Sequence, residues 1–252
     1  MDFSGKTVWV TGAGQGIGFE TALRFQKAGA HVIGIDRAFG NPEYPFLTVE
    51  MDLSDPHQIE SVCARLTAHL TTDGVALDAL VNAAGLLRLG SLQTLTMDDW
   101  HACMNVNAGG VFCLLKQLAP LFMQQKRGAI VNVASNAARV PRMQMAAYCA
   151  SKAALVSLSH CVGLELAQYG IRCNLVSPGS TDTPMLRGML KDDAALHNTI
   201  AGLPEQFKLG IPLQKIANVQ DIANTILFLA SDLAGHITLQ DIVVDGGATL
   251  SA

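Results

Sequence analysis

The chain has 252 residues, of which 50% are apolar and only 15% are charged, and its formal net charge is −4. This composition excludes intrinsic disorder, because disordered chains are polar and highly charged. The absence of a basic block argues against nucleic acid as the main partner. No stretch approaches about 20 uninterrupted apolar residues, so no membrane span is expected. Residues 1–6 lack the long apolar run of a secretory signal, which favours a cytoplasmic protein.

Short β-branched runs alternate with longer helical patterns along the whole chain. Strands are expected at residues 7–10, 31–36, 47–51, 77–81, 129–133, 171–176 and 241–244, with helices at 19–28, 55–70, 146–168 and 219–231 and a long helical stretch from residue 98. Strands that are apolar on nearly every residue and alternate with helices indicate a parallel sheet covered on both faces. No linker divides the chain and no repeat is visible. The sequence therefore predicts one α/β domain over residues 1–252, with a doubly wound parallel sheet of about seven strands.

The segment 183–209 interrupts this alternation. It carries the apolar residues Met185, Leu186, Met189 and Leu190 beside a short charged run. We predict a helical lid over a substrate site here, and an ordinary helical surface insertion is the alternative.

Residues 11–18, with the sequence Thr-Gly-Ala-Gly-Gln-Gly-Ile-Gly, lie where the first expected strand ends and the first expected helix begins. Glycines allow a tight turn and let the backbone approach a pyrophosphate, whose charge then faces the helix N-terminus. A strand before, a helix after and an acid at the end of the next strand make this pattern a specific indication of a dinucleotide site. The candidate cofactor contacts are Gly12, Gln15, Gly16, Ile17 and Gly18.

The acid is Asp36, which lies 18 residues beyond Gly18. Its carboxylate can accept hydrogen bonds from both ribose hydroxyls of NAD and would repel the additional phosphate of NADP. The neighbouring Arg37 leaves NADP as the alternative, since an arginine can bind that phosphate. We expect NAD, because the repulsion by Asp36 acts at the sugar itself.

Tyr148 and Lys152 lie four residues apart and therefore share one face of an expected helix. A phenol with an ordinary pKa of about 10 is a poor base near neutrality, and a nearby cation stabilises its phenolate and lowers that pKa. Ser135 follows the preceding strand, where its hydroxyl can orient a substrate oxygen. A tyrosine and a lysine at this spacing are common in proteins, and most such pairs lie on the surface. The spacing alone is therefore weak evidence of a catalytic site.

Together with Asn82-Ala83-Ala84-Gly85, these motifs make the chain resemble the short-chain dehydrogenase/reductase family over its whole length, which implies a Rossmann-like fold. The resemblance implies a catalytic triad of Ser135, Tyr148 and Lys152. It also implies that Asn107 completes a proton relay through water, with Asn105 as the less favoured candidate. The implied cofactor contacts are Asp52 and Leu53 at the adenine, Asn82, Ala83 and Gly85 in the quoted motif, Pro178, Gly179 and Thr183 at the nicotinamide carboxamide, and Tyr148 and Lys152. Ala84 departs from the family pattern, in which many members have a second asparagine, and this leaves the assignment standing.

Three further stretches, residues 177–183, 205–213 and 236–241, resemble one group within the family. That group oxidises a small anionic cyclic diol with NAD during siderophore biosynthesis, so the resemblance implies a substrate held by Ser135, Tyr148 and a cation for its carboxylate. We favour Arg142 as this cation, because a guanidinium binds a carboxylate with two hydrogen bonds. Arg139, Arg88 and Arg187 are the alternatives.

Two other functions stay open. A 3-oxoacyl carrier-protein reductase would use NADPH and a basic docking patch, against which Asp36 and the negative net charge argue. A catalytically silent NAD-binding scaffold would not need the triad and Asn107 together. The six cysteines have no metal-like spacing, His101 and His160 lack a partner carboxylate at useful spacing, and no metal site is expected.

The scarcity of charge also bears on assembly. A parallel sheet covered on both faces accounts for much of the apolar content, but not for a surface so poor in charge. The family resemblance implies a homotetramer, which would bury long helix faces between subunits. Contact with the next enzyme of the pathway is a further possibility that the resemblance raises.

Overall fold

In the computed structural model, which describes residues 1–40, 43–190 and 192–250, seven strands form one parallel sheet. The strands are β1 (Thr7–Thr11), β2 (His31–Asp36), β3 (Leu47–Glu50), β4 (Ala79–Asn82), β5 (Gly128–Val133), β6 (Ile171–Pro178) and β9 (Asp241–Val244). Their order is β3-β2-β1-β4-β5-β6-β9, so the chain winds outward from β1 in one direction and then from β4 in the other. This confirms the predicted doubly wound α/β fold.

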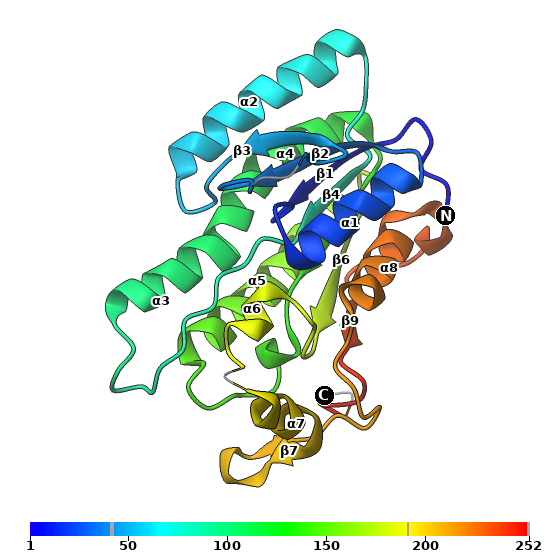
Figure 1. The fold of residues 1–252 in the computed structure, drawn as a ribbon. Helices are drawn as coiled ribbons and strands as arrows, with labels where there is room; N and C mark the ends of the chain where they lie inside the picture. Colours follow the sequence, from blue (N-terminus) through cyan, green and yellow to red (C-terminus); the bar gives the residue numbers. More distant parts are fainter. Residues whose placement is uncertain (41–42, 191, 251–252) are drawn as a thin grey trace.

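Helices cover both faces of the sheet (Figure 1). One layer contains α2 (Pro56–Asp73), α4 (Gly110–Gln125) and α5 (Ala146–Ala167), and the other contains α1 (Gly16–Lys27) and α8 (Val219–Ala230). The long helical stretch expected from residue 98 is three consecutive segments: α3 (Met97–Met104), a π-helical turn η1 (Asn105–Gly109) and α4. The π turn was not predicted, because its sequence has no distinguishing composition.

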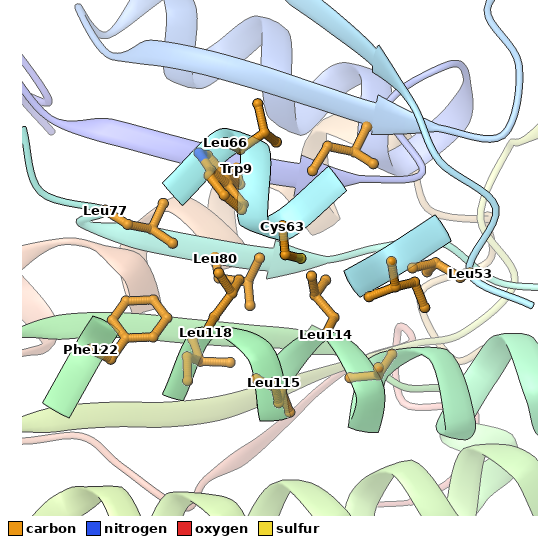
Figure 2. Close-up of a cluster of buried hydrophobic side chains, with 14 of the residues drawn as sticks. Trp9, Leu53, Cys63, Leu66, Leu77, Leu80, Leu114, Leu115, Leu118 and Phe122 are labelled. Atoms are coloured by element: carbon orange, nitrogen blue, oxygen red, sulfur yellow. The ribbon is translucent and has the colours of Figure 1, made fainter. Parts of the chain in front are cut away.

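Apolar side chains from β1, β4, α2 and α4 form the larger core (Figure 2). Trp9, Leu80, Leu114, Leu118 and Phe122 are completely buried in it. Among the described residues, one helical run, 97–125, is long and apolar enough to cross a membrane by length and composition alone. The apolar side of its α4 part packs in this core against α2, so the run has the pattern of a core helix.

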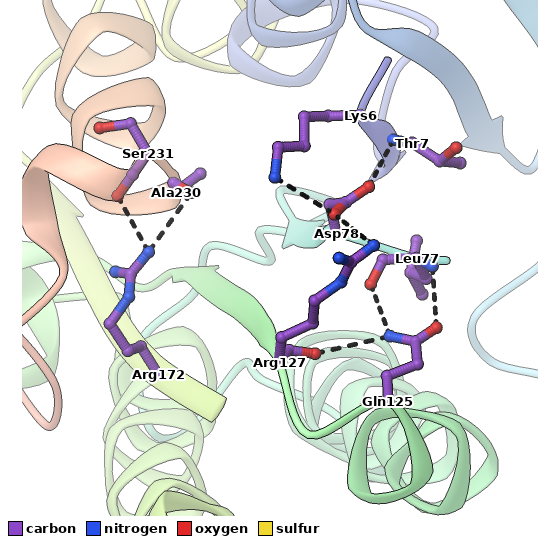
Figure 3. Close-up of polar contacts among 9 residues, drawn as sticks. All are labelled: Lys6, Thr7, Leu77, Asp78, Gln125, Arg127, Arg172, Ala230 and Ser231. Atoms are coloured by element: carbon purple, nitrogen blue, oxygen red, sulfur yellow. Dashed lines mark hydrogen bonds and ion pairs between the residues drawn. The ribbon is translucent and has the colours of Figure 1, made fainter. Parts of the chain in front are cut away.

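Polar contacts join the strands at the edge of the sheet where they begin (Figure 3). Asp78, just before β4, accepts a 2.9 Å hydrogen bond from the Thr7 amide and pairs with Lys6 at 3.6 Å and Arg127 at 3.5 Å. Elsewhere, Arg172 on β6 donates hydrogen bonds to the last carbonyls of α8, including that of Ser231 at 3.0 Å. These contacts stabilise the edge of the sheet that lies opposite the ends of the strands.

The segment 183–209 is only partly helical, which corrects the prediction of a helical lid. It contains α6 (Pro184–Arg187), α7 (Asp193–Ala201) and an antiparallel hairpin of β7 (Gly202–Leu203) and β8 (Lys208–Leu209), joined by a 3₁₀ turn, η3 (Pro204–Gln206). Gly202 ends α7 at φ +99°, a conformation that strongly favours glycine, and Pro204 begins the separate 3₁₀ turn. In Figure 1, α7 and β7 project from the body of the domain beyond α6.

Candidate active site

Two connected hollows open where the parallel strands end, which is where ligands bind in folds of this type. We call the larger, of about 880 Å³, the nucleotide cleft, and the smaller, of about 620 Å³, the inner cavity. Ile17, Ala83, Gly85 and Thr183 line both hollows, so they form one continuous depression.

Most of the predicted site residues line this depression. The nucleotide cleft is lined by Gly12, Gln15, Gly16, Ile17, Gly18, Asp36, Asp52, Leu53, Ala83, Gly85 and Thr183, and the inner cavity by Ser135, Arg142, Tyr148, Lys152, Pro178 and Gly179. Two predicted residues, Asn82 and Asn107, line neither hollow. Asn82 is buried at the end of β4, where its side chain donates a 2.7 Å hydrogen bond to Asn132 on β5. The side chain of Asn82 therefore joins β4 to β5.

The glycine-rich turn holds the backbone closer to its neighbours than a side chain would allow. Gly12 has φ +72°, and a Cβ atom there would lie 2.6 Å from the Ala84 amide nitrogen. A Cβ atom on Gly18 would overlap the carbonyl oxygen of Gly12, so glycine is needed for α1 to pack against the end of β1. The turn thus leaves a shallow backbone surface at the N-terminus of α1, which suits a pyrophosphate.

Asp36 faces this turn from the end of β2. Its carboxylate accepts hydrogen bonds from the Gly14 amide at 2.9 Å and from the Arg37 amide at 2.7 Å. Tyr44, which sequence reasoning did not identify, donates a 3.0 Å hydrogen bond to the Gly14 carbonyl. Asp36 and Tyr44 therefore hold Gly14 through its amide and its carbonyl, and the Asp36 carboxylate is fixed relative to the turn.

Tyr148 and Lys152 lie on one face of α5, both almost fully buried, with the Lys152 ammonium 5.9 Å from the centre of the Tyr148 ring. Lys152 also donates a 2.8 Å hydrogen bond to the Val133 carbonyl. Burial raises the pKa of Tyr148 to about 12, although a hydrogen bond with the Ser135 side chain opposes this shift. Burial lowers the pKa of Lys152 to about 8. Both shifts have one cause, because burial disfavours the charged form of each group.

Asn107 lies in the π turn and is completely buried. Its side-chain oxygen accepts from the Leu86 amide at 2.7 Å, and its nitrogen donates to the Leu86 carbonyl and to the Ser151 hydroxyl, both at 2.8 Å. Ser151 in turn donates to the Tyr148 carbonyl at 2.8 Å. Asn107 thus connects the wall after β4 to the helix that carries Tyr148, and π turns often occur at functional sites. Asn105, the less favoured candidate, lines the nucleotide cleft instead.

The four candidate arginines differ in their partners. Arg88 pairs with Asp99 at 3.4 Å, Arg139 with Asp241 at 3.0 Å, and Arg187 with Asp182 through two hydrogen bonds of 2.7 and 2.8 Å. The half-buried side chain of Arg142 lines the inner cavity and has no ion pair with any residue that the structure describes. Burial also lowers the pKa of its guanidinium.

Comparison with known proteins agrees with this geometry. Residues 12–249 match a family model described as enoyl-(acyl carrier protein) reductase. The chain is 60% identical to the 2,3-dihydro-2,3-dihydroxybenzoate dehydrogenase of Escherichia coli (strain K12) over the full length of both chains. It is 43% identical to the enzyme of the same name from Bacillus subtilis (strain 168), over 98% of this chain and 97% of that protein. The chain belongs to the short-chain dehydrogenase/reductase family.

A solved relative supports the same family fold. The aldohexose dehydrogenase of Thermoplasma acidophilum superposes with a TM-score of 0.87 at 28% identity, covering 99% of this chain and 96% of that one. Dehydrogenases of the short-chain family are oxidoreductases that use nicotinamide cofactors. The glycine turn, which a Cβ atom would fill, and the fixed Asp36 carboxylate both fit such a cofactor.

Proposed function

We propose that this chain oxidises 2,3-dihydro-2,3-dihydroxybenzoate to 2,3-dihydroxybenzoate with NAD⁺ in the biosynthesis of a catecholate siderophore. The observation that carries this proposal is the full-length identity of 60% to the enzyme of that name, combined with an inner cavity that contains Ser135, Tyr148 and Lys152. The Arg142 guanidinium in the same cavity, which has no ion pair with the described residues, suits an anionic substrate.

In the proposed reaction, the Tyr148 phenolate oxygen accepts the proton of one ring hydroxyl as the hydride leaves the carbon that bears it. NAD⁺, when bound, supplies the acceptor for that hydride. Ser135 donates a hydrogen bond to the oxygen that becomes a carbonyl, and Lys152 binds the ribose and stabilises the phenolate. Asn107 positions Tyr148 through Ser151 and completes the proton relay to water. The resulting ketone tautomerises to the catechol, so the substrate loses one proton and one hydride and becomes aromatic.

The preference for NAD over NADP is part of this proposal. The Asp36 carboxylate lies at the end of β2 with both oxygens oriented by backbone amides, and it would repel the additional phosphate of NADP. The exposed Arg37 lines the same cleft and is the residue on which the NADP alternative depends. Gln15, Asp52 and Leu53 would contact the pyrophosphate and adenine, and Pro178, Gly179 and Thr183 the carboxamide.

We propose Arg142 as the residue that binds the substrate carboxylate. Of the four candidate arginines, Arg142 lines the inner cavity and lacks an ion pair with the described part of the chain, whereas the other three each pair with an aspartate. Placing a carboxylate beside Arg142 would offset the cost of burying its charge.

We also propose that the protein is a cytoplasmic homotetramer that contacts the next enzyme of its pathway. Large apolar side chains are exposed on two separate faces: Phe112 and Leu164 on α4 and α5, and Leu233 and Ile242 near α8 and β9. Two self-complementary faces on one subunit are what a tetramer with dihedral symmetry requires. Light scattering at micromolar concentration tests this, and a monomer would contradict it.

The reaction is tested by following NADH formation from NAD⁺ and the dihydrodiol carboxylate, with Tyr148→Phe as the matched variant. We expect activity that Tyr148→Phe reduces at least a hundredfold, which is the lower range for loss of a general base. Equal rates for the two proteins, or no NADH from the wild type, would overturn the proposal. Activity on a 3-oxoacyl thioester with NADPH would favour the carrier-protein reductase instead.

A further inference from the structure

Besides Arg142 and Lys152, the inner cavity is lined by a third cation, Lys208, to which the sequence motifs assign no role. Lys208, on β8 of the 202–209 hairpin, lines the cavity together with Arg142, which precedes α5. Both side chains are half-buried. Within residues 1–40, 43–190 and 192–250, no ion pair and no side-chain hydrogen bond links either cation to another residue. Arg142 and Lys208 therefore both line this cavity without an acidic partner among the described residues.

Lys208 is less exposed than the apolar residues on either side of it. Its neighbours Phe207 and Leu209 are 88% and 57% exposed, whereas Lys208 is half-buried at the cavity, which Leu209 also lines. Apolar side chains are ordinarily buried in preference to a lysine. Local rules of this kind are broken mainly at functional sites.

The two cations also influence each other. Burial lowers the pKa of Lys208, and the positive charge of Arg142 lowers it further. Glu205 lines the same cavity but is exposed and makes no ion pair with either cation in the described structure. Asp245 acts on Arg142 at longer range, yet its oxygens already accept from Asn136 at 3.2 Å and Thr249 at 2.7 Å. Neither acid neutralises the pair, which leaves room for an anion of the ligand.

We propose that Lys208 is a substrate-binding residue, whose ammonium holds the carboxylate of the substrate together with Arg142 and so joins the hairpin to the bound ligand. This inference rests on the proposed function and deepens it. Arg142 belongs to the wall beside Tyr148, whereas Lys208 belongs to the projecting segment, so the carboxylate would bridge the two. The anionic group of the substrate, rather than its ring alone, would then hold the hairpin closed.

The test measures binding rather than turnover. Protein saturated with NAD⁺ is titrated calorimetrically with 2-hydroxybenzoate and, separately, with its neutral analogue 2-hydroxybenzamide. The variants are Lys208→Met, which keeps the length of the side chain and removes its charge, and Lys208→Arg, which keeps the charge. Lys215→Met is the matched control, because Lys215 is exposed and lines neither hollow. Thermal unfolding verifies that each variant is folded.

We expect Lys208→Met to weaken binding of 2-hydroxybenzoate at least tenfold, which corresponds to about 1.4 kcal/mol and lies near the lower end for a hydrogen bond to a charged group. Lys208→Arg should stay within threefold of wild type, Lys215→Met should match it, and binding of 2-hydroxybenzamide should not change in Lys208→Met. Unchanged affinity for the benzoate in Lys208→Met, equal losses for both ligands, or no benzoate binding by the wild type would overturn the role of Lys208. If the wild type binds the benzoate as expected but produces no NADH from the dihydrodiol carboxylate, the proposed reaction fails and the assignment of Lys208 stands.

Discussion

Replacing Lys152 with methionine should stabilise the fold while it abolishes function. Burial lowers the pKa of Lys152 from 10.5 to about 8, and each pKa unit corresponds to about 1.4 kcal/mol. Keeping this side chain charged in the native state therefore costs about 3 kcal/mol at neutral pH. Methionine removes that cost but loses the 2.8 Å hydrogen bond to the Val133 carbonyl, which contributes about 1 kcal/mol. The net gain is about 2 kcal/mol, equivalent to a rise in Tm of roughly 4–8 °C for a chain of this length.

The pH dependence of this gain distinguishes charge burial from a simple packing effect. The unfolded chain keeps the lysine proton up to about pH 10.5, whereas the native protein loses it near pH 8. Between these values the unfolded state binds more protons, so wild-type stability rises with pH relative to the variant. Urea unfolding of both proteins at pH 7 and pH 9.5, at one protein concentration and without cofactor, should show the advantage of Lys152→Met shrinking at the higher pH. A variant less stable than wild type at pH 7, or a difference that does not change with pH, would refute the reasoning.

Three other substitutions test separate parts of the site. Gly12→Ala should weaken the binding of NADH, measured by fluorescence, and lower the free energy of unfolding by more than about 2 kcal/mol, because its Cβ would meet the Ala84 backbone. Gly5 has the same φ of +72° but open space around it, so the control Gly5→Ala should lower the free energy of unfolding by only about 1 kcal/mol. Asn107→Ala removes three buried hydrogen bonds and should lower the free energy of unfolding by about 2–4 kcal/mol in urea titrations. Asp36→Ala should raise the KM for NAD⁺ about tenfold and lower that for NADP⁺; unchanged KM values for both cofactors would contradict the proposed selectivity.

The framework of the fold could be read from the sequence, because short apolar runs and turn residues are local signals. The strands β2 and β9 have the predicted bounds, and the other five sheet strands differ from prediction by a few residues. The region after residue 183 could not be read in this way. Its apolar spacing resembles a helix, but Gly202 at φ +99° and Pro204 end α7 and start a hairpin whose two strands contain two residues each. Such short strands have too few residues to show an alternating pattern.

A sequence motif can indicate that a residue belongs to the candidate site, but it does not show which groups the side chain contacts in the folded protein. Asn82 and Asn107 match family motifs, and both side chains are buried. Asn82 hydrogen-bonds Asn132, whereas Asn107 hydrogen-bonds Leu86 and Ser151. Lys208 lies in the stretch 205–213 that resembles one group of the family, but that resemblance assigns it no role. Its place at the inner cavity follows from the folded hairpin and not from a sequence pattern.

The charge states of Tyr148 and Lys152 connect the energetics of the fold to its proposed chemistry. With pKa values of about 12 and about 8, the pair at pH 7 is a neutral phenol beside an ammonium, and a neutral phenol cannot accept a proton. An additional positive charge near the phenol would lower the pKa of Tyr148 toward the working range, and NAD⁺ carries such a charge on its nicotinamide ring whereas NADH does not. The base should therefore be active chiefly when the oxidised cofactor is bound. Burial of Tyr148, which makes it a poor base by itself, thus restricts proton removal to the complex in which a hydride acceptor is present.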